Sequence, residues 1–375
     1  MKKKILITSV HMDIGGIETV LLNFLKLIDP DKFEVDLVLY KPFGINLNKI
    51  PAFIKVYSPF SYKGEKLIEN LTKNDKITSK IIRKLNFNNI TLKHYISSKK
   101  YDVGIAFSGY HYLMDKFVGL SKCKKKYIWV HTDFKYLVDS NLKFKKRFYK
   151  ESKKYNNFDK IICVSKSCEE QFKLLLSNQQ NKITSIENLF YFDKSIQKQN
   201  LNGKFKILSI GRLSYQKGYD RLISVVEKLK QDTNEDFFVT VLGDGEEKQN
   251  LLELTKNKKI EDKIEFKGFC NDVSEYLNSA DLLVSTSYAE GAGMVFLEAL
   301  ASKVPIVAPK VTGVKDIEEF APKDSVLLTD NHVEGIKNGI IQAMKGKVNK
   351  NFNFDIDKYN NRIIKLYRRV LEGDL

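Results

Sequence analysis

The chain has 375 residues and a net charge of +17, with 43% hydrophobic residues, 29% charged residues and only 7 Pro. This composition excludes a disordered or fibrous chain, and the length favours two domains over one core. The sequence shows no run of about 18 uncharged apolar residues and no leader-like cleavage site, which argues against a spanning helix and favours a cytosolic chain. Its four cysteines include no C-x-x-C pair, which argues against a disulfide framework and a thiolate metal site.

The first half of the chain begins with a βαβ pattern. Residues 4–10 form a short apolar run typical of a buried parallel strand, a glycine turn occupies residues 11–16, and apolar side chains then recur at helical spacing from Ile17 to Ile28. Residues 33–40 predict the next strand, which makes one right-handed βαβ unit. Further strands are expected at residues 103–107, 127–130 and 161–164, whereas residues 60–100, rich in Lys and Asn with helical patches, are not placed.

The pattern restarts after a polar stretch, residues 193–204, which we interpret as a linker. The predicted strands cover residues 205–210, 237–242, 264–268, 281–287 and 305–308. The predicted helices cover residues 219–229, 246–257, 273–279 and 294–302. Such alternation predicts a doubly wound parallel sheet.

The predicted fold is therefore α/β, with two Rossmann-like domains whose parallel sheets face a central cleft. We assign residues 1–195 to the first domain and residues 200–350 to the second, and the helix at about 355–375 can pack back on the first. Ligands of open α/β sheets bind at the carboxyl ends of the strands. We expect the functional residues at those ends.

The densest group of candidate residues runs from Ser287 to Ala299, where an apolar strand gives way to a helix. Its glycines let a ligand approach the backbone, and the amides at the helix start point outward, as in a cradle for an anion or a sugar hydroxyl. Glu290 stands in the turn. Glu298 lies inside an apolar helix, where an unpaired carboxylate is costly, and it therefore needs donors such as the two hydroxyls of a ribose. A glycine turn with one surface glutamate is the plainer alternative.

A second group, Gly211 to Gly218, directly follows the first strand of the second half. Arg212 offers a planar fork for phosphate oxygens and Lys217 a point charge, so the two cations can balance a diphosphate without a metal. Two solvated surface cations are the alternative, and the position after a strand argues against it.

These residues resemble a large family of retaining nucleotide-sugar glycosyltransferases with the GT-B fold. The resemblance rests on Gly211-Arg212-Leu213 with Lys217-Gly218, and on Glu290-Gly291-x-Gly293 through Glu298-Ala299, with seven residues between the two glutamates. It continues at residues 305–308 and 312–313, and in the first half at Gly15-Gly16-Ile17-Glu18 and Asn188.

The resemblance implies roles for individual residues. The positions of Arg212 and Lys217 hold the donor diphosphate and stabilise it as it leaves, and the position of Glu298 holds the ribose. Glu290 lies against the donor sugar, and His131, which follows the strand 127–130, faces that sugar. Other implied contacts to the donor come from Gly211, Phe269, Gly291, Gly293, Met294 and Val295, and Gly15 and Gly16 form an acceptor-side or phosphate loop. A histidine or glycine turn of purely structural role remains the alternative for each of the first-half positions.

The implied reaction transfers a hexose-type sugar, with a UDP-sugar as the expected donor, to a surface-glycan or lipid-linked acceptor of polysaccharide (capsule or exopolysaccharide) biosynthesis. A nucleoside diphosphate is a good leaving group, so cations and helix-start amides suffice and no metal or other cofactor is expected. Asp355-Ile356-Asp357 imitates a metal-binding carboxylate pair, but its place before the final helix favours capping. The sequence departs from the family at Ala292, where a bulky residue is common, and at Lys303, where glycine is common.

The excess positive charge lies in one half of the chain. Residues 1–200 hold 37 Lys and Arg against 19 Asp and Glu, whereas residues 201–375 hold 26 against 27. Cations mix with aromatics at residues 122–126 and 143–154, which suits an anionic membrane surface. We expect a peripheral location on the inner face of a membrane; an ordinary helix with a solvated basic face is equally open.

Three other classes of function are weighed against the transferase. A nucleotide-sugar epimerase of the same fold would need acid and base groups at the sugar carbon and no acceptor. A nucleic-acid-binding protein would suit the basic half, but the sequence contains no zinc spacing, helix-turn-helix signature or RNA-binding aromatic motif, so no nucleic-acid partner is expected. A dinucleotide dehydrogenase is disfavoured because the first turn lacks G-x-G-x-x-G and no acidic residue ends the second strand.

Overall fold

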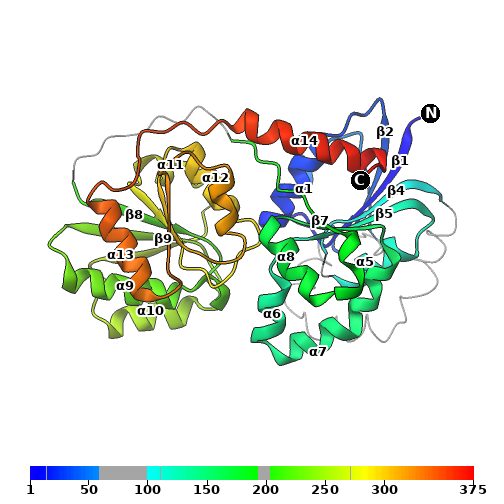
Figure 1. Cartoon of the computed structure of the whole chain (residues 1–375). Helices are drawn as coiled ribbons and strands as arrows, with labels where there is room; N and C mark the ends of the chain where they lie inside the picture. The colour runs from blue at the N-terminus through cyan, green and yellow to red at the C-terminus, as the bar shows by residue number, and fades with distance from the viewer. Residues whose placement is uncertain (14, 59–98, 110, 193–202, 271) are drawn as a thin grey trace. The chain divides into compact units, whose positions relative to one another are not determined.

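The computed structural model describes residues 1–13, 15–58, 99–109, 111–192, 203–270 and 272–375. Most of the unplaced stretch 60–100 and of the linker 193–204 lies outside the described residues. The chain forms two compact units: unit 1 comprises Met1–Leu189 with Asn361–Leu375, and unit 2 comprises Phe190–Asn360 (Figure 1).

Unit 1 is built on a seven-stranded sheet in the order β3-β2-β1-β4-β5-β6-β7, and all its neighbouring strands pair in parallel. Its strands are β1 (Lys3–Ser9), β2 (Phe33–Leu39), β3 (Lys55–Tyr57), β4 (Tyr101–Ala106), β5 (Cys123–Val130), β6 (Lys160–Cys163) and β7 (Ile183–Ser185). Its helices are α1 (Gly16–Lys26), α5 (Tyr112–Leu120), α6 (Phe134–Ser140), α7 (Leu142–Glu151) and α8 (Lys166–Leu175), with short 3-10 turns η1 (Leu47–Lys49), η2 (Ser152–Asn157) and η3 (Ser177–Lys182).

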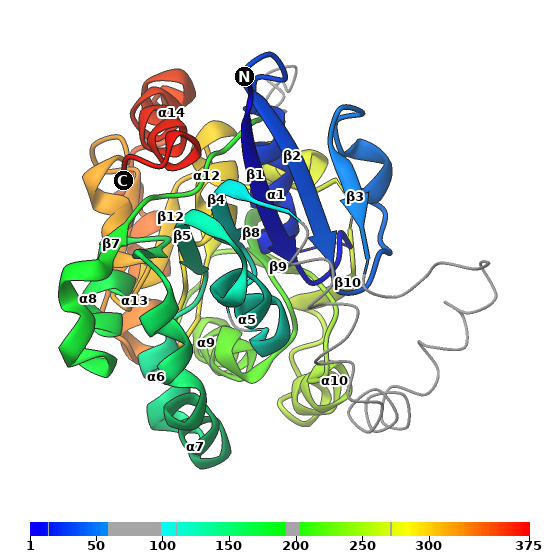
Figure 2. The ribbon, with the colours of Figure 1, turned by 90° about the vertical axis from the view of Figure 1, so that its right-hand side faces the viewer.

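The strand order reverses between β1 and β4, so right-handed crossovers place α1 and α5 on opposite faces of the sheet. Figure 2 looks onto this sheet, with α5 in front of it and α1 behind. The apolar side of α1 is buried against the strands, as the helical spacing predicts.

Unit 2 repeats the architecture with a six-stranded parallel sheet in the order β10-β9-β8-β11-β12-β13. Its strands are β8 (Phe205–Ile210), β9 (Phe237–Leu242), β10 (Ile264–Gly268), β11 (Leu282–Val284), β12 (Ile306–Pro309) and β13 (Val326–Thr329). Its helices are α9 (Tyr219–Asp232), α10 (Lys248–Asn257), α11 (Ser274–Ser279), α12 (Met294–Ala301) and α13 (Val333–Met344), with 3-10 turns η4 (Tyr215–Lys217) and η5 (Lys315–Glu319). The predicted α/β class with two parallel, doubly wound sheets is confirmed.

The last helix, α14 (Ile356–Glu372), begins in unit 2 and continues into unit 1. The Asp355 carboxylate accepts a hydrogen bond from the Lys358 amide at 2.9 Å, which is the capping geometry that the sequence favours for this aspartate. Farther along the helix, Tyr367 is fully buried in unit 1. Its ring lies 4.9 Å from that of Phe24 and 5.7 Å from that of Trp129, between centroids. The end of the chain therefore completes an aromatic core that begins on α1.

The basic residues at 122–126 and 143–154 differ in their burial and in their ion pairs. Lys124 forms an ion pair with Asp102 at 2.7 Å. Lys154 forms one with Asp115 at 2.5 Å, and both of those side chains are buried. Lys154 therefore serves the packing of unit 1, whereas the Lys124 side chain is 79% exposed and all the cations on α7 are exposed.

Replacing Tyr367 with Ala should destabilise unit 1 by about 3–5 kcal/mol, because it leaves a cavity in the aromatic core. Trp129 is the only tryptophan of the chain and is fully buried in that core, so its fluorescence during urea unfolding reports on unit 1 alone. Arg368→Ala, on the exposed side of the same helix, should change stability by less than about 0.5 kcal/mol. Equal urea midpoints of unfolding for the two variants would contradict the structural role of α14.

Candidate active site

The two motif-bearing loops of unit 2 follow neighbouring strands. Residues 211–218 follow β8 and residues 285–293 follow β11. These strands pair in parallel, with Ile207 opposite Leu282, and the strand order of the sheet reverses between them. A reversal point of this kind is where open α/β sheets bind ligands.

Hydrogen bonds tie the two loops together. The amide of Tyr288 donates to the carbonyl of Gln216 at 2.8 Å, and the Gln216 side chain donates back to the carbonyl of Ala289, also at 2.8 Å. The Thr286 hydroxyl donates to the carbonyl of Lys217 at 3.2 Å. The loops therefore behave as one piece, and residues far apart in the sequence keep a fixed spacing.

Gly218 allows this close approach. Its φ of 65° lies in the left-handed region, and a Cβ atom there would come within 2.1 Å of the Thr286 carbonyl oxygen. No side chain fits between the loops at that point.

Arg221, near the start of α9, supports the second loop from behind. Its guanidinium donates to the carbonyl of Thr286, with an Nε distance of 3.1 Å, and to Asn331 Oδ1 at 2.7 Å. The same guanidinium lies 3.9 Å from the centroid of the Tyr288 ring, and Tyr215 stacks on that ring at 5.2 Å. Sequence reasoning did not name Arg221 and gave Tyr288 no role of its own, because nothing in the local sequence marks a contact between segments this far apart.

Lys217 and Glu290, both expected at the site, meet directly. Lys217 Nζ lies 2.7 Å from Glu290 Oε1, and the same oxygen accepts a hydrogen bond from the Ser287 hydroxyl at 2.5 Å. The Glu290 side chain is buried, so its charge is desolvated and the interaction with the ammonium is strong. The amide of Glu290 donates to the carbonyl of Thr312 at 3.1 Å, which attaches a third loop to the second.

Arg212 extends from the same loop into solvent. Among the residues that the structure describes, no acidic side chain pairs with its guanidinium, whereas Lys217 is already paired. Gly211 precedes it with a φ of 159°, and the neighbouring loop packs closely, since a Cβ on Gly243 would come within 1.9 Å of the Gly211 carbonyl oxygen. Arg212 is thus an exposed cation on a well-supported backbone.

The start of α12 presents its amides at this edge of the sheet. Gly293 caps the helix with a φ of 53°, a conformation that favours glycine, and a Cβ there would collide with the Phe296 ring. The amides of Met294 and Val295 belong to the first turn, where the helix supplies no carbonyl partner. Gly291 is buried in the same loop. The arrangement fits the predicted cradle for a negatively charged group.

Glu298 is half-buried on α12, between apolar residues. Burial raises the pKa of its carboxyl to about 7, and no other cause contributes. No described side chain compensates its charge. The carboxylate is therefore available to accept hydrogen bonds from a ligand.

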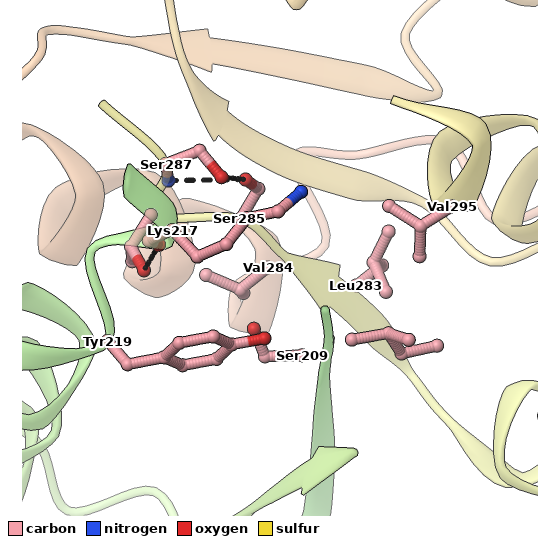
Figure 3. A pocket seen from close by; sticks show the side chains of 10 residues that line it. Ser209, Lys217, Tyr219, Leu283, Val284, Ser285, Ser287 and Val295 are labelled. Atoms are coloured by element: carbon pink, nitrogen blue, oxygen red, sulfur yellow. Dashed lines mark hydrogen bonds between the residues drawn. The ribbon is translucent and has the colours of Figure 1, made fainter. Parts of the chain in front are cut away.

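A small pocket opens between β8 and β11 (Figure 3). Of the predicted residues, only Lys217 and Val295 line it; the others in its wall are Ser209, Ile210, Tyr219, Leu283, Val284, Ser285, Thr286 and Ser287. Arg212, Glu290 and Glu298 are outside its lining. Figure 3 shows the Tyr219 ring extending across the pocket below Lys217.

Phe269 lies at the end of β10, on the edge of the sheet, and 49% of its surface is exposed. It connects to the other loops through residues 243–245, since the amide of Gly243 donates to the carbonyl of Gly268 at 2.8 Å and that of Leu213 to the carbonyl of Asp244 at 3.0 Å. Sequence reasoning gave residues 243–245 no role at this edge, although Gly-Asp-Gly directly after a strand was a signal for one.

The remaining predicted residues belong to unit 1. His131 follows β5; its Nε2 lies 2.7 Å from the carbonyl oxygen of Phe107, and burial lowers its pKa to about 4. The ring is therefore neutral at physiological pH and, with Nε2 donating, leaves Nδ1 as an acceptor. Gly15 and Gly16 open α1, and a Cβ on Gly15 would come within 2.2 Å of a Glu18 carboxylate oxygen, whereas Gly16 faces open space.

Two further findings concern the described residues as a whole. None of their helices is long and apolar enough to cross a membrane. They also contain no cluster of three or more His, Cys, Asp or Glu side chains suited to hold a metal ion.

Comparisons with known proteins agree on one family. Residues 192–364 match the model of the glycosyl transferases group 1. An uncharacterized glycosyltransferase of Haemophilus influenzae is 27% identical over 340 residues, which cover 87% of this chain and 86% of the relative. The poly(ribitol-phosphate) alpha-N-acetylglucosaminyltransferase of Staphylococcus aureus is 30% identical over 53% of this chain and 41% of its own length.

Solved structures show the same architecture. HepE of Anabaena, solved in complex with UDP and glucose, superposes with a TM-score of 0.69 over 98% of this chain and 99% of its own, at 18% sequence identity. At that identity the likeness concerns the fold.

Gly218→Ala should destabilise unit 2 by about 2–4 kcal/mol, because the new Cβ forces the two loops apart in addition to straining the backbone. Gly346→Ala is a matched control, because its φ is also positive, at 74°, but no atom lies within 4 Å of the added Cβ. This variant should lose only about 1 kcal/mol in free energy of unfolding. Chemical unfolding monitored by circular dichroism compares the two variants. Similar losses would mean that the contact with Thr286 does not constrain the loops.

Proposed function

We propose that this chain transfers a hexose-type sugar from a UDP-linked donor to a surface-glycan or lipid-linked acceptor. The proposal starts from the match of residues 192–364 to the glycosyl transferases group 1, from the glycosyltransferase relatives and from the GT-B fold. The transfer retains the anomeric configuration and uses no metal ion. Residues 200–350 bind the donor and residues 1–195 the acceptor side.

The observation that carries the proposal is the joined pair of loops at the reversal point of the unit 2 sheet. They hold Lys217 against Glu290 at 2.7 Å and leave Arg212 exposed beside them. Two cations and the first amides of α12 then face one edge, and a diphosphate carries the charge that this set would neutralise.

In the proposed reaction, the acceptor oxygen forms a bond to the anomeric carbon as the bond between that carbon and the diphosphate oxygen breaks. The developing negative charge on the diphosphate is stabilised by Arg212 and Lys217, and a phosphate oxygen takes the acceptor's proton. Glu290 lies near the sugar and stabilises its developing positive charge. The Ser287 hydroxyl and the Lys217 ammonium orient this carboxylate before substrate arrives.

Glu298 binds the ribose in this proposal. Its carboxylate is partly desolvated and has no compensating partner among the described residues, and two ribose hydroxyls would supply the missing donors. Phe269 lies against the base, and Gly211, Gly291, Gly293, Met294 and Val295 contribute backbone contacts.

The acceptor side is assigned to unit 1. His131, held neutral and oriented by the Phe107 carbonyl, contacts the transferred sugar, and Gly15 and Gly16 form the loop that admits phosphate or acceptor. A role in polysaccharide biosynthesis is supported by the relatives, which include an amylovoran biosynthesis glycosyltransferase of Erwinia amylovora and the Staphylococcus aureus enzyme named for poly(ribitol-phosphate).

Arg212→Ala and Lys217→Ala should each weaken binding of the matching nucleotide sugar by about 10–100-fold, the loss expected for one charged hydrogen bond to phosphate. A thermal-shift panel of nucleotide sugars identifies the donor, and calorimetry on each variant measures the loss. Lys256→Ala, an exposed lysine on α10, is the control and should bind as the unaltered protein does. EDTA should leave binding and turnover unchanged. A donor that binds all three variants equally would place the diphosphate elsewhere.

Donor affinity should increase between pH 6 and pH 8. The raised pKa of about 7 means that Glu298 is largely protonated at the lower pH and anionic at the higher, and the anion is the stronger acceptor for ribose hydroxyls. If only the anion binds, the gain in affinity is about tenfold. Titration calorimetry with the nucleotide sugar measures the profile, and Glu298→Gln should flatten it. A pH-dependent gain that persists in Glu298→Gln would assign the effect to another group.

A further inference from the structure

Helix α7 of unit 1 carries an outward face that nothing in the proposed reaction uses. Its inward residues, Phe144 and Phe148, pack on Phe134, with ring centroids 5.7 Å from that ring in both cases. This anchoring fixes the rotation of α7. In Figures 1 and 2 the helix lies at the periphery of unit 1, away from the sheet.

Two large apolar side chains occupy the centre of the outward face. Leu142 is 76% exposed and Tyr149 is 49% exposed. They are seven residues apart, so they lie two turns apart on the same side of the helix. A leucine and a tyrosine aligned in solvent have no role in the core, which the opposite side of the helix already serves.

Cations surround this apolar pair. Lys146 lies between the two on the same face, Lys145 lies to one side, and Lys143 and Lys150 lie to the other; all four are exposed. Among the residues that the structure describes, none of these four lysines has an acidic partner, in contrast to Lys154, which is buried against Asp115. The only carboxylate of α7 is Glu151, at its end.

We propose that the outward face of α7 docks on an anionic lipid bilayer, with Leu142 and Tyr149 entering the interface and the lysines contacting lipid phosphates. The charge complements anionic headgroups, and the aligned apolar pair distinguishes a bilayer from a soluble polyanion, which would use the cations alone. The inference does not depend on the transferase reaction, because docking is measured without substrates.

The experiment uses the full chain and vesicles of phosphatidylcholine with and without 30% phosphatidylglycerol. The unaltered protein should float with the anionic vesicles and not with the neutral ones. Lys145→Gln with Lys146→Gln should lower the partition coefficient at least tenfold, since each lysine near an anionic surface contributes about a fivefold factor. Leu142→Ser with Tyr149→Ser should lower it several-fold with the charge unchanged. Lys256→Gln with Lys345→Gln, exposed lysines of unit 2, is the charge-matched control and should bind normally.

Insertion itself is measured with a tryptophan reporter. Leu142→Trp adds a second tryptophan to Trp129, which is fully buried, so quenching by brominated phosphatidylglycerol reports on α7. Leu252→Trp, at a 41% exposed leucine of α10, is the matched control and should not be quenched. Equal binding to neutral vesicles, no binding to either kind, or an unquenched Leu142→Trp would overturn the proposal. So would loss of binding in the lysine variant only, with the apolar variant unaffected, which would indicate a polyanion surface.

Discussion

The direct hydrogen bonding between the loops after β8 and β11 is the constraint on which the candidate site depends. Parallel strands that are neighbours in the sheet bring the two loops close, but the sheet alone does not fix the contacts between them. The backbone contact at Gly218 and the bonds from Gln216 and Thr286 do so. Lys217 and Glu290 then meet across the joint with little freedom left to lose when a ligand binds.

The two glutamates of the motif are placed in opposite electrostatic situations. Glu290 is buried but compensated, since an ammonium and a hydroxyl contact the same oxygen. Glu298, eight positions along the chain, is half-buried with no compensating partner among the described residues, and burial raises the pKa of its carboxyl to about 7. A pair of carboxylates whose surroundings separate their behaviour is a common arrangement in enzymes, because one can orient and stabilise while the other waits for its ligand.

Sequence reasoning reached the two parallel sheets and the placement of the motifs at strand ends, because apolar runs and glycine turns are local signals. It did not find the short strands β3, β7 and β13, which have three or four residues each and too little pattern to detect. It also missed the stack of Tyr215, Tyr288 and Arg221, whose members become neighbours only after the sheet forms. Lys303 was found from the sequence only as a departure from the family's glycine. The structure adds the reason, since its φ of 58° lies in the left-handed region that glycine adopts most easily.

The charge of unit 1 illustrates what a count of residues leaves open. A surplus of lysines predicts an anionic partner, but a lysine that is already paired contributes little to binding one. Lys154 and Asp115 desolvate each other inside unit 1, and such a pair is worth less as stability than as a constraint on how the surrounding segments pack. Lys124 also pairs with Asp102, but its side chain stays 79% exposed. The cations of α7 are all exposed, and two phenylalanines on the other side of the helix set its rotation. The same packing that buries the phenylalanines therefore decides which lysines, and which two apolar side chains, face outward together.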